Sequence, residues 1–227
     1  EVLKVADSIT VIRAGTTVTS VSPQDVTARD LAELMVGSDL PTPEARESTV
    51  TDRVVLSVRG LTVASGTGRP VVEDVTFDIH AGEIVGIAGV EGNGQTELIE
   101  AIIGLQPLER GSVQLDGQDI TEWSTRRRRE EGVGYIPQDR HRHGLLLDAP
   151  LWENAALGHQ TAPPFSKGMF IDRAGARGRT ETIVADYDVR TPGIEVPAHA
   201  LSGGNQQKLI VGREMEASPK VLIAAHP

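Results

Sequence analysis

The sequence contains no cysteine, which excludes disulfide bridges, thiolate-ligated metal sites and cysteine nucleophiles. It also lacks an excess of basic charge, because 22 Lys and Arg residues face 32 Asp and Glu residues and the net charge is -10. A nucleic-acid binder needs a basic face, so we expect no nucleic-acid partner. No apolar run approaches the ~20 residues that span a bilayer, and no charged-then-apolar start indicates a signal peptide.

The chain has enough apolar residues for a core, since 39% of its 227 residues are hydrophobic. It begins with Glu1 and stops at Pro227 directly after an apolar run, so we expect a piece of a longer protein.

The first part of the chain reads as a hairpin and a helix. Residues 8–21 alternate around a turn, as hairpins do. A helix is expected next, with Ser22 as N-cap, Pro23 at the first helical position and Gly37 as the stop. Residues 38–53 show no apolar period and are predicted to be a linker.

A glycine loop follows the apolar run EIVGIAG, residues 83–89. Such a run suits a strand buried on both faces of a parallel sheet. Residues 96–104, TELIEAIIG, then place apolar side chains on one helical face. Strand, glycine loop and helix is the context of a phosphate-binding loop, although Gln95 stands where such a loop has lysine.

A second anion-binding feature is the pair Gly203 and Gly204, which opens a predicted helix. Between the two features, residues 150–190 read as mostly helical. The basic run at 126–129 is followed by two glutamates and is predicted to be a solvated helix face. His141 and His143 form an H-x-H pair with no third ligand suggested nearby, which favours a solvated loop over a metal site.

GVEGNGQT, YIPQ, LSGGNQQK and VLIAAHP, in this order, resemble the nucleotide-binding domain of ABC transporters. The LSGGNQQK spelling is similar to importers of simple sugars and nucleosides, whose ATPase subunit carries two cassettes in tandem. The resemblance implies an α/β P-loop NTPase fold with a mixed sheet core, an antiparallel β subdomain and a helical subdomain at about 139–200. Residues 1–37 resemble the C-terminal tail of a first cassette, and residues 54–227 a second cassette that is C-terminally incomplete.

The resemblance also assigns roles to residues. The Walker A positions that would hold ATP are Gly89, Gly92, Asn93, Gly94, Gln95, Thr96 and Glu97. Thr96 and the Q-loop residue Gln138 would bind Mg²⁺. The signature, which would contact the ATP seated on the partner cassette, comprises Ser202, Gly203, Gly204, Asn205 and Gln206.

Several family residues are missing. The Walker B aspartate and catalytic glutamate positions hold Ala225 and His226, and residues 61–70 lack the family's adenine-stacking aromatic. Catalysis in P-loop enzymes is mostly electrostatic positioning, so we expect weak ATP binding and negligible hydrolysis at this cassette's own loop. The intact signature would instead complete the first cassette's ATP site.

The expected partners are the first cassette of the same chain, transmembrane permease subunits and, through these, a periplasmic or lipoprotein solute-binding protein. The expected place is the cytoplasmic face of the plasma membrane. AAHP together with GNGQT resembles the nucleoside-importing branch more than the ribose branch. The alternatives are a non-transport ABC ATPase, a P-loop kinase, and an interaction or regulatory module that does not hydrolyse ATP.

Overall fold

The computed structural model describes residues 2–13, 15–37, 47–64 and 68–225. His226 and residues 38–46 of the predicted linker therefore lie outside the described residues. The chain divides into two compact units, Glu1–Ser48 and Thr49–Pro227. No helix of the described ranges is long and apolar enough to cross a bilayer.

The first unit contains the predicted hairpin and helix. Its elements are α1 (Val2–Val5), β1 (Ile9–Arg13), β2 (Thr16–Val21) and α2 (Ala28–Val36). The strands pair antiparallel, which confirms the hairpin. The expected N-cap Ser22 is wrong: Thr27 caps α2, because it exchanges hydrogen bonds with Asp30 in a capping box, whereas Gly37 ends the helix at φ 84° as expected.

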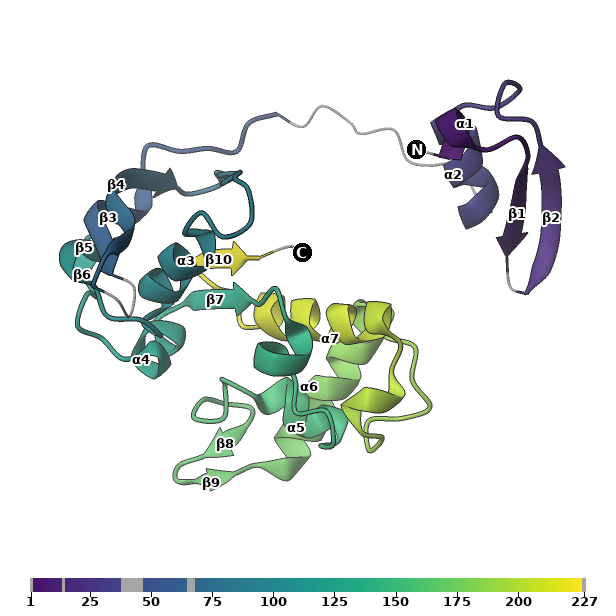
Figure 1. The fold of residues 1–227 in the computed structure, drawn as a ribbon. Helices are drawn as coiled ribbons and strands as arrows, with labels where there is room; N and C mark the ends of the chain where they lie inside the picture. Colours follow the sequence, from purple (N-terminus) through teal and green to yellow (C-terminus); the bar gives the residue numbers. More distant parts are fainter. Residues whose placement is uncertain (1, 14, 38–46, 65–67, 226–227) are drawn as a thin grey trace. The chain divides into compact units, whose positions relative to one another are not determined.

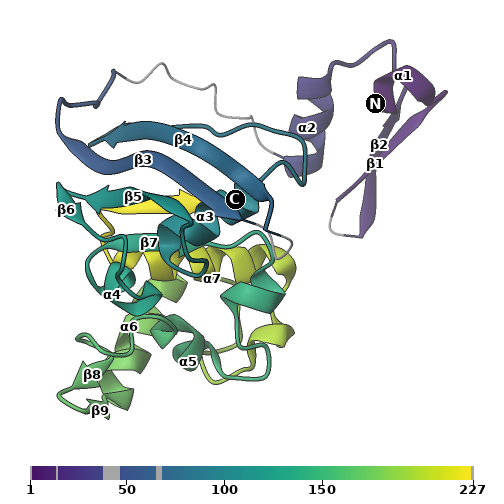
Figure 2. The ribbon, with the colours of Figure 1, turned by 60° about the vertical axis from the view of Figure 1, so that its left-hand side comes forward.

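An antiparallel sheet begins the second unit. It contains β3 (Val54–Ala64), β4 (Pro70–His80), β5 (Arg110–Leu115) and β6 (Gln118–Asp119), in the order β4-β3-β5-β6. Helix α3 (Gln95–Ile103) packs against this sheet in one apolar core, which includes Leu56, Val58, Leu61, Val113, Leu98 and Ile102. Figure 2 shows α3 lying next to this sheet.

A parallel pair connects the sheet to the helical part. It consists of β7 (Val133–Ile136) and β10 (Val221–Ala224), with Val133 opposite Val221. Helix α7 (Gly203–Glu216) packs against β7, and α4 (Thr125–Glu130) contacts β7 and α3. The backbone N–H groups of Lys220 and Val221 bond Gly132 O at 2.9 and 3.2 Å, which fixes where the pair begins.

The helical part forms a second core. It contains the π-helix η1 (Arg140–Gly144), α5 (Leu151–Ala156), β8 (Ser166–Lys167), β9 (Phe170–Ile171), α6 (Arg173–Asp186) and the 3-10 helix η2 (Ala198–Ala200). Its core side chains come mainly from α5, α6 and α7, including Leu151, Ile183, Leu209 and Ile210. In Figure 1 these helices lie beyond the β7–β10 pair, with β8 and β9 at their far end.

The predicted strand at 83–89 is wrong. These residues have no regular secondary structure, and Ile84, Val85 and Ile87 are 98%, 39% and 54% exposed. A strand exists only through hydrogen bonds to a neighbour, and no strand among the described residues pairs with this segment. The apolar sequence of this segment would allow burial in a sheet, but it cannot by itself provide the neighbouring strand with which the segment would have to pair.

The prediction of a solvated Arg126–Arg129 face is wrong for two of the four residues. Arg128 is 2% exposed, and its guanidinium donates to four carbonyl groups, those of Ala101, Ile102, Thr121 and Trp123. The first two belong to the last turn of α3, where carbonyl groups lack helical partners, so Arg128 caps this helix. Arg129 forms an ion pair with buried Glu214 at 2.9 Å.

Candidate functional site

The glycine loop of residues 89–96 leads directly into α3. Gly92 and Gly94 have φ angles of 89° and 96°, and Gly94 is the N-cap of the helix. A Cβ atom at Gly94 would lie 2.6 Å from Val71 O, so both the backbone angle and the close approach require glycine here. No side chain caps this helix start, which leaves backbone N–H groups of the first turn open to an anion.

The Gln95 side chain lies back across the loop. Its Nε2 atom donates to Val90 O at 3.2 Å, and a Cβ atom built at Gly89 would lie only 2.0 Å from it. The position of the family's lysine is thus filled by a neutral amide, whose donor is used within the loop. Thr96, next along the helix, is exposed.

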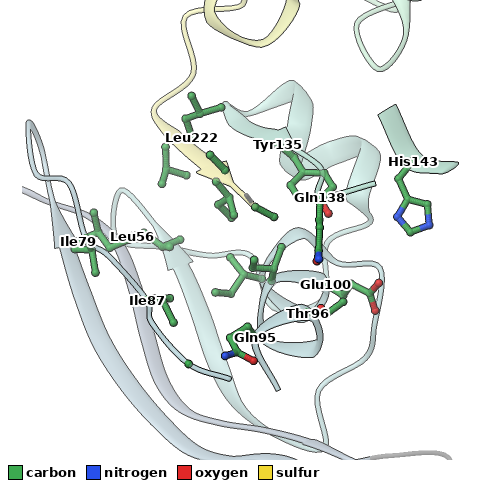
Figure 3. A pocket seen from close by; sticks show the side chains of 18 of the residues that line it. Leu56, Ile79, Ile87, Gln95, Thr96, Glu100, Tyr135, Gln138, His143 and Leu222 are labelled. Carbon is green, nitrogen blue, oxygen red and sulfur yellow. The ribbon is translucent and has the colours of Figure 1, made fainter. Parts of the chain in front are cut away.

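A cavity of about 400 Å³ opens beside the loop. Thr96 and Gln138 both line it, as Figure 3 shows, together with Gly89, Gly92, Gln95 and Ala225. The structure therefore brings the predicted Walker A, Q-loop and Walker B positions together. Its apolar lining includes Leu56, Ile79, Ile87 and Leu222.

The charges around this cavity are negative. Glu91, Glu100 and Asp139 line it, and no Lys or Arg does so among the described residues. The backbone N–H of Arg142, and then that of His141, hold the pKa of Asp139 below its usual range, so this carboxylate is ionised at neutral pH. Phosphate would meet three carboxylates and, apart from the imidazole of His143, no basic side chain here, so a bound divalent ion would have to offset this repulsion.

The two expected Mg²⁺ ligands are neutral. Thr96 supplies a hydroxyl and Gln138 an amide oxygen, and these hard oxygen ligands suit Mg²⁺. Across the described ranges, no group of three or more His, Asp or Glu residues forms a preformed metal site, the H-x-H pair included.

The predicted signature lies elsewhere, at the start of α7. None of residues 202–206 lines the cavity beside the glycine loop in the part of the chain described. Ser202 is the N-cap without a side-chain cap bond, and its hydroxyl accepts from Asn205 Nδ2 at 2.9 Å. The side-chain oxygen Asn205 Oδ1 accepts from the backbone N–H of Arg190 at 2.9 Å. The Gln206 side chain turns into the interior and is 4% exposed, whereas Ser202 and Gly204 are exposed.

The remaining predicted Walker A residues are Asn93, which lies in the loop, and Glu97, which lies in the first turn of α3. Asn93 is exposed and its backbone N–H bonds Val90 O at 3.2 Å, which closes the turn. Glu97 is the acidic residue of the first turn of α3 and is half-buried.

A buried ion network around Glu214 was not predicted. The Glu214 side chain is 0% exposed and lies 2.9 Å from both Arg129 and Arg213, and it also accepts from Tyr135 N at 3.2 Å. Burial would raise the pKa of Glu214, but His159 and the two arginines lower it to about 2. The network joins α7 to α4 and β7; its only sign in the sequence is an acidic residue among the apolar positions of a helix.

A second cavity, of about 460 Å³, lies between the sheet part and the helical part. It is lined by Ile103 and Leu105 at the end of α3, by Arg126 and Arg129 of α4, and by residues of the 157–161 segment. One atom beside it, Arg129 Nε, is buried and has no hydrogen-bond partner. The arginines that line this groove are paired with glutamates, Arg126 with Glu130 and both Arg129 and Arg213 with Glu214.

The sequence profile of the family described as "ABC transporter" matches residues 72–227, more than half of the chain. The chain is 42% identical over 223 residues to the guanosine import ATP-binding protein NupO of Bacillus subtilis, covering 98% of this chain and 44% of that protein. It is 42% identical over 227 residues to the nucleoside import ATP-binding protein NupA of Lactococcus lactis, covering 100% and 45%. It therefore spans less than half the length of these curated relatives.

The fold is similar to that of solved ATP-binding cassettes. A dimeric structure of a post-hydrolysis state of the cassette MJ0796, bound to ADP and Pi, matches with a TM-score of 0.62 at 19% identity, over 74% of this chain and 72% of that chain. The P-loop fold with antiparallel, parallel and helical parts is thereby confirmed. From its sequence and its fold, the chain belongs to the ABC transporter family.

Proposed function

We propose that this chain is the nucleotide-binding part of an importer ATPase subunit that couples ATP to the uptake of a nucleoside or a simple sugar. The names of the relatives NupO and NupA, both nucleoside importers, favour a nucleoside. Residues 54–227 would be a second cassette, residues 1–37 the tail of a first one and 38–53 the linker between them.

The glycine loop would bind Mg-ATP weakly and would not hydrolyse it. The observation that carries this proposal is the cavity lined by three carboxylates and no Lys or Arg among the described residues, with the Gln95 amide folded across the loop. A hydrogen bond to a charged donor is roughly twice as strong as one to a neutral donor, so Gln95 recovers only part of what lysine provides. The methyl side chain of Ala225 cannot hold a metal ion or a water molecule as a carboxylate would.

The signature would contact the ATP that is bound by the first cassette, not the ATP at this cassette's own glycine loop. The uncapped start of α7 presents backbone N–H groups from Gly203 and Gly204, and these suit a phosphate carried by the first cassette. This cassette would then complete the hydrolytic ATP site of the first cassette, while the ATP site at its own glycine loop is impaired.

The groove between the sheet part and the helical part would receive a segment of the permease. Ile103 and Leu105 provide apolar contact, and the exposed Arg126 at its edge suits a carboxylate or a helix C-terminus. Through the permease the subunit would act with a periplasmic or lipoprotein solute-binding protein, at the cytoplasmic face of the membrane.

Titration calorimetry of the chain with Mg-ATP, together with an assay of released phosphate, tests the proposal. We expect weak binding and no release, with the binding lost in Thr96→Ala and kept in the control Thr182→Ala, an exposed threonine of α6. Phosphate release that Thr96→Ala abolishes would refute the impaired loop. Absence of binding up to millimolar Mg-ATP would favour the alternative, an interaction module that meets ATP only through its signature.

A further inference from the structure

A short hairpin extends from the helical part of the second unit. It consists of β8 and β9, in which Lys167 lies opposite Phe170. Its base is held in place, because the backbone N–H of Asp172 bonds Phe165 O at 2.9 Å and the Asp172 side chain caps α6. Phe165 is 7% exposed and belongs to the core of the helical part. The hairpin turn therefore stands on a fixed support, at the far end of this part in Figure 1.

The tip of this hairpin is apolar and exposed. Met169 is 95% exposed, Phe170 80% and Ile171 49%, and the three residues are consecutive. A Cβ atom at Gly168, the other turn residue, would meet no atom within 4 Å, and residues 168–171 line neither of the two cavities. Three consecutive exposed apolar side chains are unfavourable in water unless a partner covers them. A protruding tip suits a soft surface that it can enter.

Cations stand directly behind the apolar tip. Lys167 is 81% exposed and lies beside Phe170, because opposite residues of a hairpin share one face. Arg173, the first residue of α6, is exposed and has no hydrogen-bond or ion-pair partner within the described ranges.

The surrounding stretch is positive although the chain as a whole is negative. Within residues 157–180, Asp172 is the one acidic residue, against one lysine and three arginines, whereas the net charge of the chain is -10. Two of these arginines are paired with glutamates of other segments, so Lys167 and Arg173 are the accessible cations nearest the tip. Their charge is complementary to a negatively charged surface.

We propose that the β8–β9 hairpin inserts its tip into the surface of a membrane that contains anionic lipids. The order of the groups matches that of a lipid leaflet. The side chains of Met169 and Phe170 reach the boundary of the acyl chains, while Lys167 and Arg173 remain at the level of the anionic headgroups. An aromatic ring between an apolar and a charged layer is the arrangement that membrane interfaces favour.

The hairpin also continues a segment that faces the membrane component in the proposed function. Residues 157–161 line the groove that would receive the permease, and they lead directly into the hairpin. The tip would then touch lipid beside the permease. The inference rests on the proposed function only for this direction.

Sedimentation of the full chain with lipid vesicles tests the inference. The vesicles contain equal parts of phosphatidylcholine and phosphatidylglycerol, with pure phosphatidylcholine for comparison. We expect the wild-type protein to bind the anionic vesicles, and the partition coefficient to fall about tenfold in Phe170→Ser, which removes the largest apolar side chain of the tip. Arg173→Gln should lower it about fivefold on anionic vesicles and leave it unchanged on neutral ones.

The matched control is Ile84→Ser, because this side chain is 98% exposed but lies in the segment before the glycine loop. Its partition coefficient should stay within about twofold of the wild-type value. Fluorescence of Phe170→Trp gives the depth: lipids brominated on the acyl chain should quench the added indole, while the signal of Trp123 and Trp152, read from the wild-type protein, is subtracted.

Three results would overturn the inference. The first is a wild-type protein that does not sediment with anionic vesicles, which would leave the tip to a protein partner. The second is an equal loss in Phe170→Ser and Ile84→Ser, and the third is no quenching in Phe170→Trp. No nucleotide is present in these measurements, so the proposed function fails separately, through release of phosphate that depends on Thr96.

Discussion

Replacing Glu214 by glutamine removes the one carboxylate from the buried network that joins α7 to α4 and β7. The side chain is 0% exposed and pairs with Arg129 and Arg213. Glutamine keeps the size and one acceptor oxygen but leaves two arginines without a counter-charge. Breaking a buried pair from one side costs about 3–5 kcal/mol, so we expect the free energy of unfolding at pH 7 to fall by about this much.

The pH dependence gives a second, independent magnitude for the free energy that Glu214 contributes to stability. The folded pKa of Glu214 is about 2 against an ordinary value of 4.5, and at about 1.4 kcal/mol per pKa unit this gap contributes about 3 kcal/mol. Because the folded pKa is the lower one, this stability is fully present above pH 4.5 and is lost as the pH falls towards 2. Between pH 7 and pH 3 the wild-type protein should lose about 2 kcal/mol from this group, and Glu214→Gln should lose that much less.

Urea unfolding at pH 7 and pH 3, followed by circular dichroism, measures both quantities. The control is Glu153→Gln, an exposed carboxylate on α5, and we expect it to change stability by less than about 0.5 kcal/mol at either pH. If Glu214→Gln matched this control at pH 7 and kept the wild-type acid sensitivity, the network would not hold the two parts together as argued.

Three further substitutions test other features. Arg128→Met leaves α3 carbonyl groups buried without donors and should lower the free energy of unfolding by about 2–4 kcal/mol, against less than about 1 kcal/mol for exposed Arg126→Met; equal effects in urea unfolding would refute the capping role. Ile84→Ala should change stability by less than about 0.5 kcal/mol, because the side chain is 98% exposed, while Ile102→Ala in the core should cost about 2–5 kcal/mol. A large cost at residue 84 would show that this segment is buried in solution. Gln95→Lys supplies the missing cation and should raise the affinity for Mg-ATP about tenfold in calorimetry; an unchanged affinity would mean that the loop does not hold phosphate.

Predictions from local sequence patterns were correct where residues close together in the sequence decide the structure. The hairpin strands β1 and β2, the glycine loop before α3 and the stop of α2 at Gly37 all depend on backbone angles that glycine and alternation set within a few residues. The N-cap of α2 was misplaced although its signal was present, since Thr27 and Asp30 stand three residues apart in the capping-box pattern.

The candidate site was predicted in part. The order of the four motifs is a property of the sequence, whereas their meeting is a property of the structure, which places Thr96, Gln138 and Ala225 at one cavity. The inward turn of Gln206 and the place of Arg140 beside Gly203 are not sequence properties, because each depends on where η1, η2 and α7 meet.

The sequence by itself determined the family, the glycines at two helix starts and the replacement of lysine by Gln95 in the glycine loop. Only the tertiary structure decided which arginines of the basic run are buried, because Arg128 and Arg129 find their partners on α3 and α7, far along the chain. It also decided that the apolar segment 83–89 is not a strand. Hydrophobicity is a property of the residues, whereas a strand or a buried ion pair exists only when a partner is placed beside it.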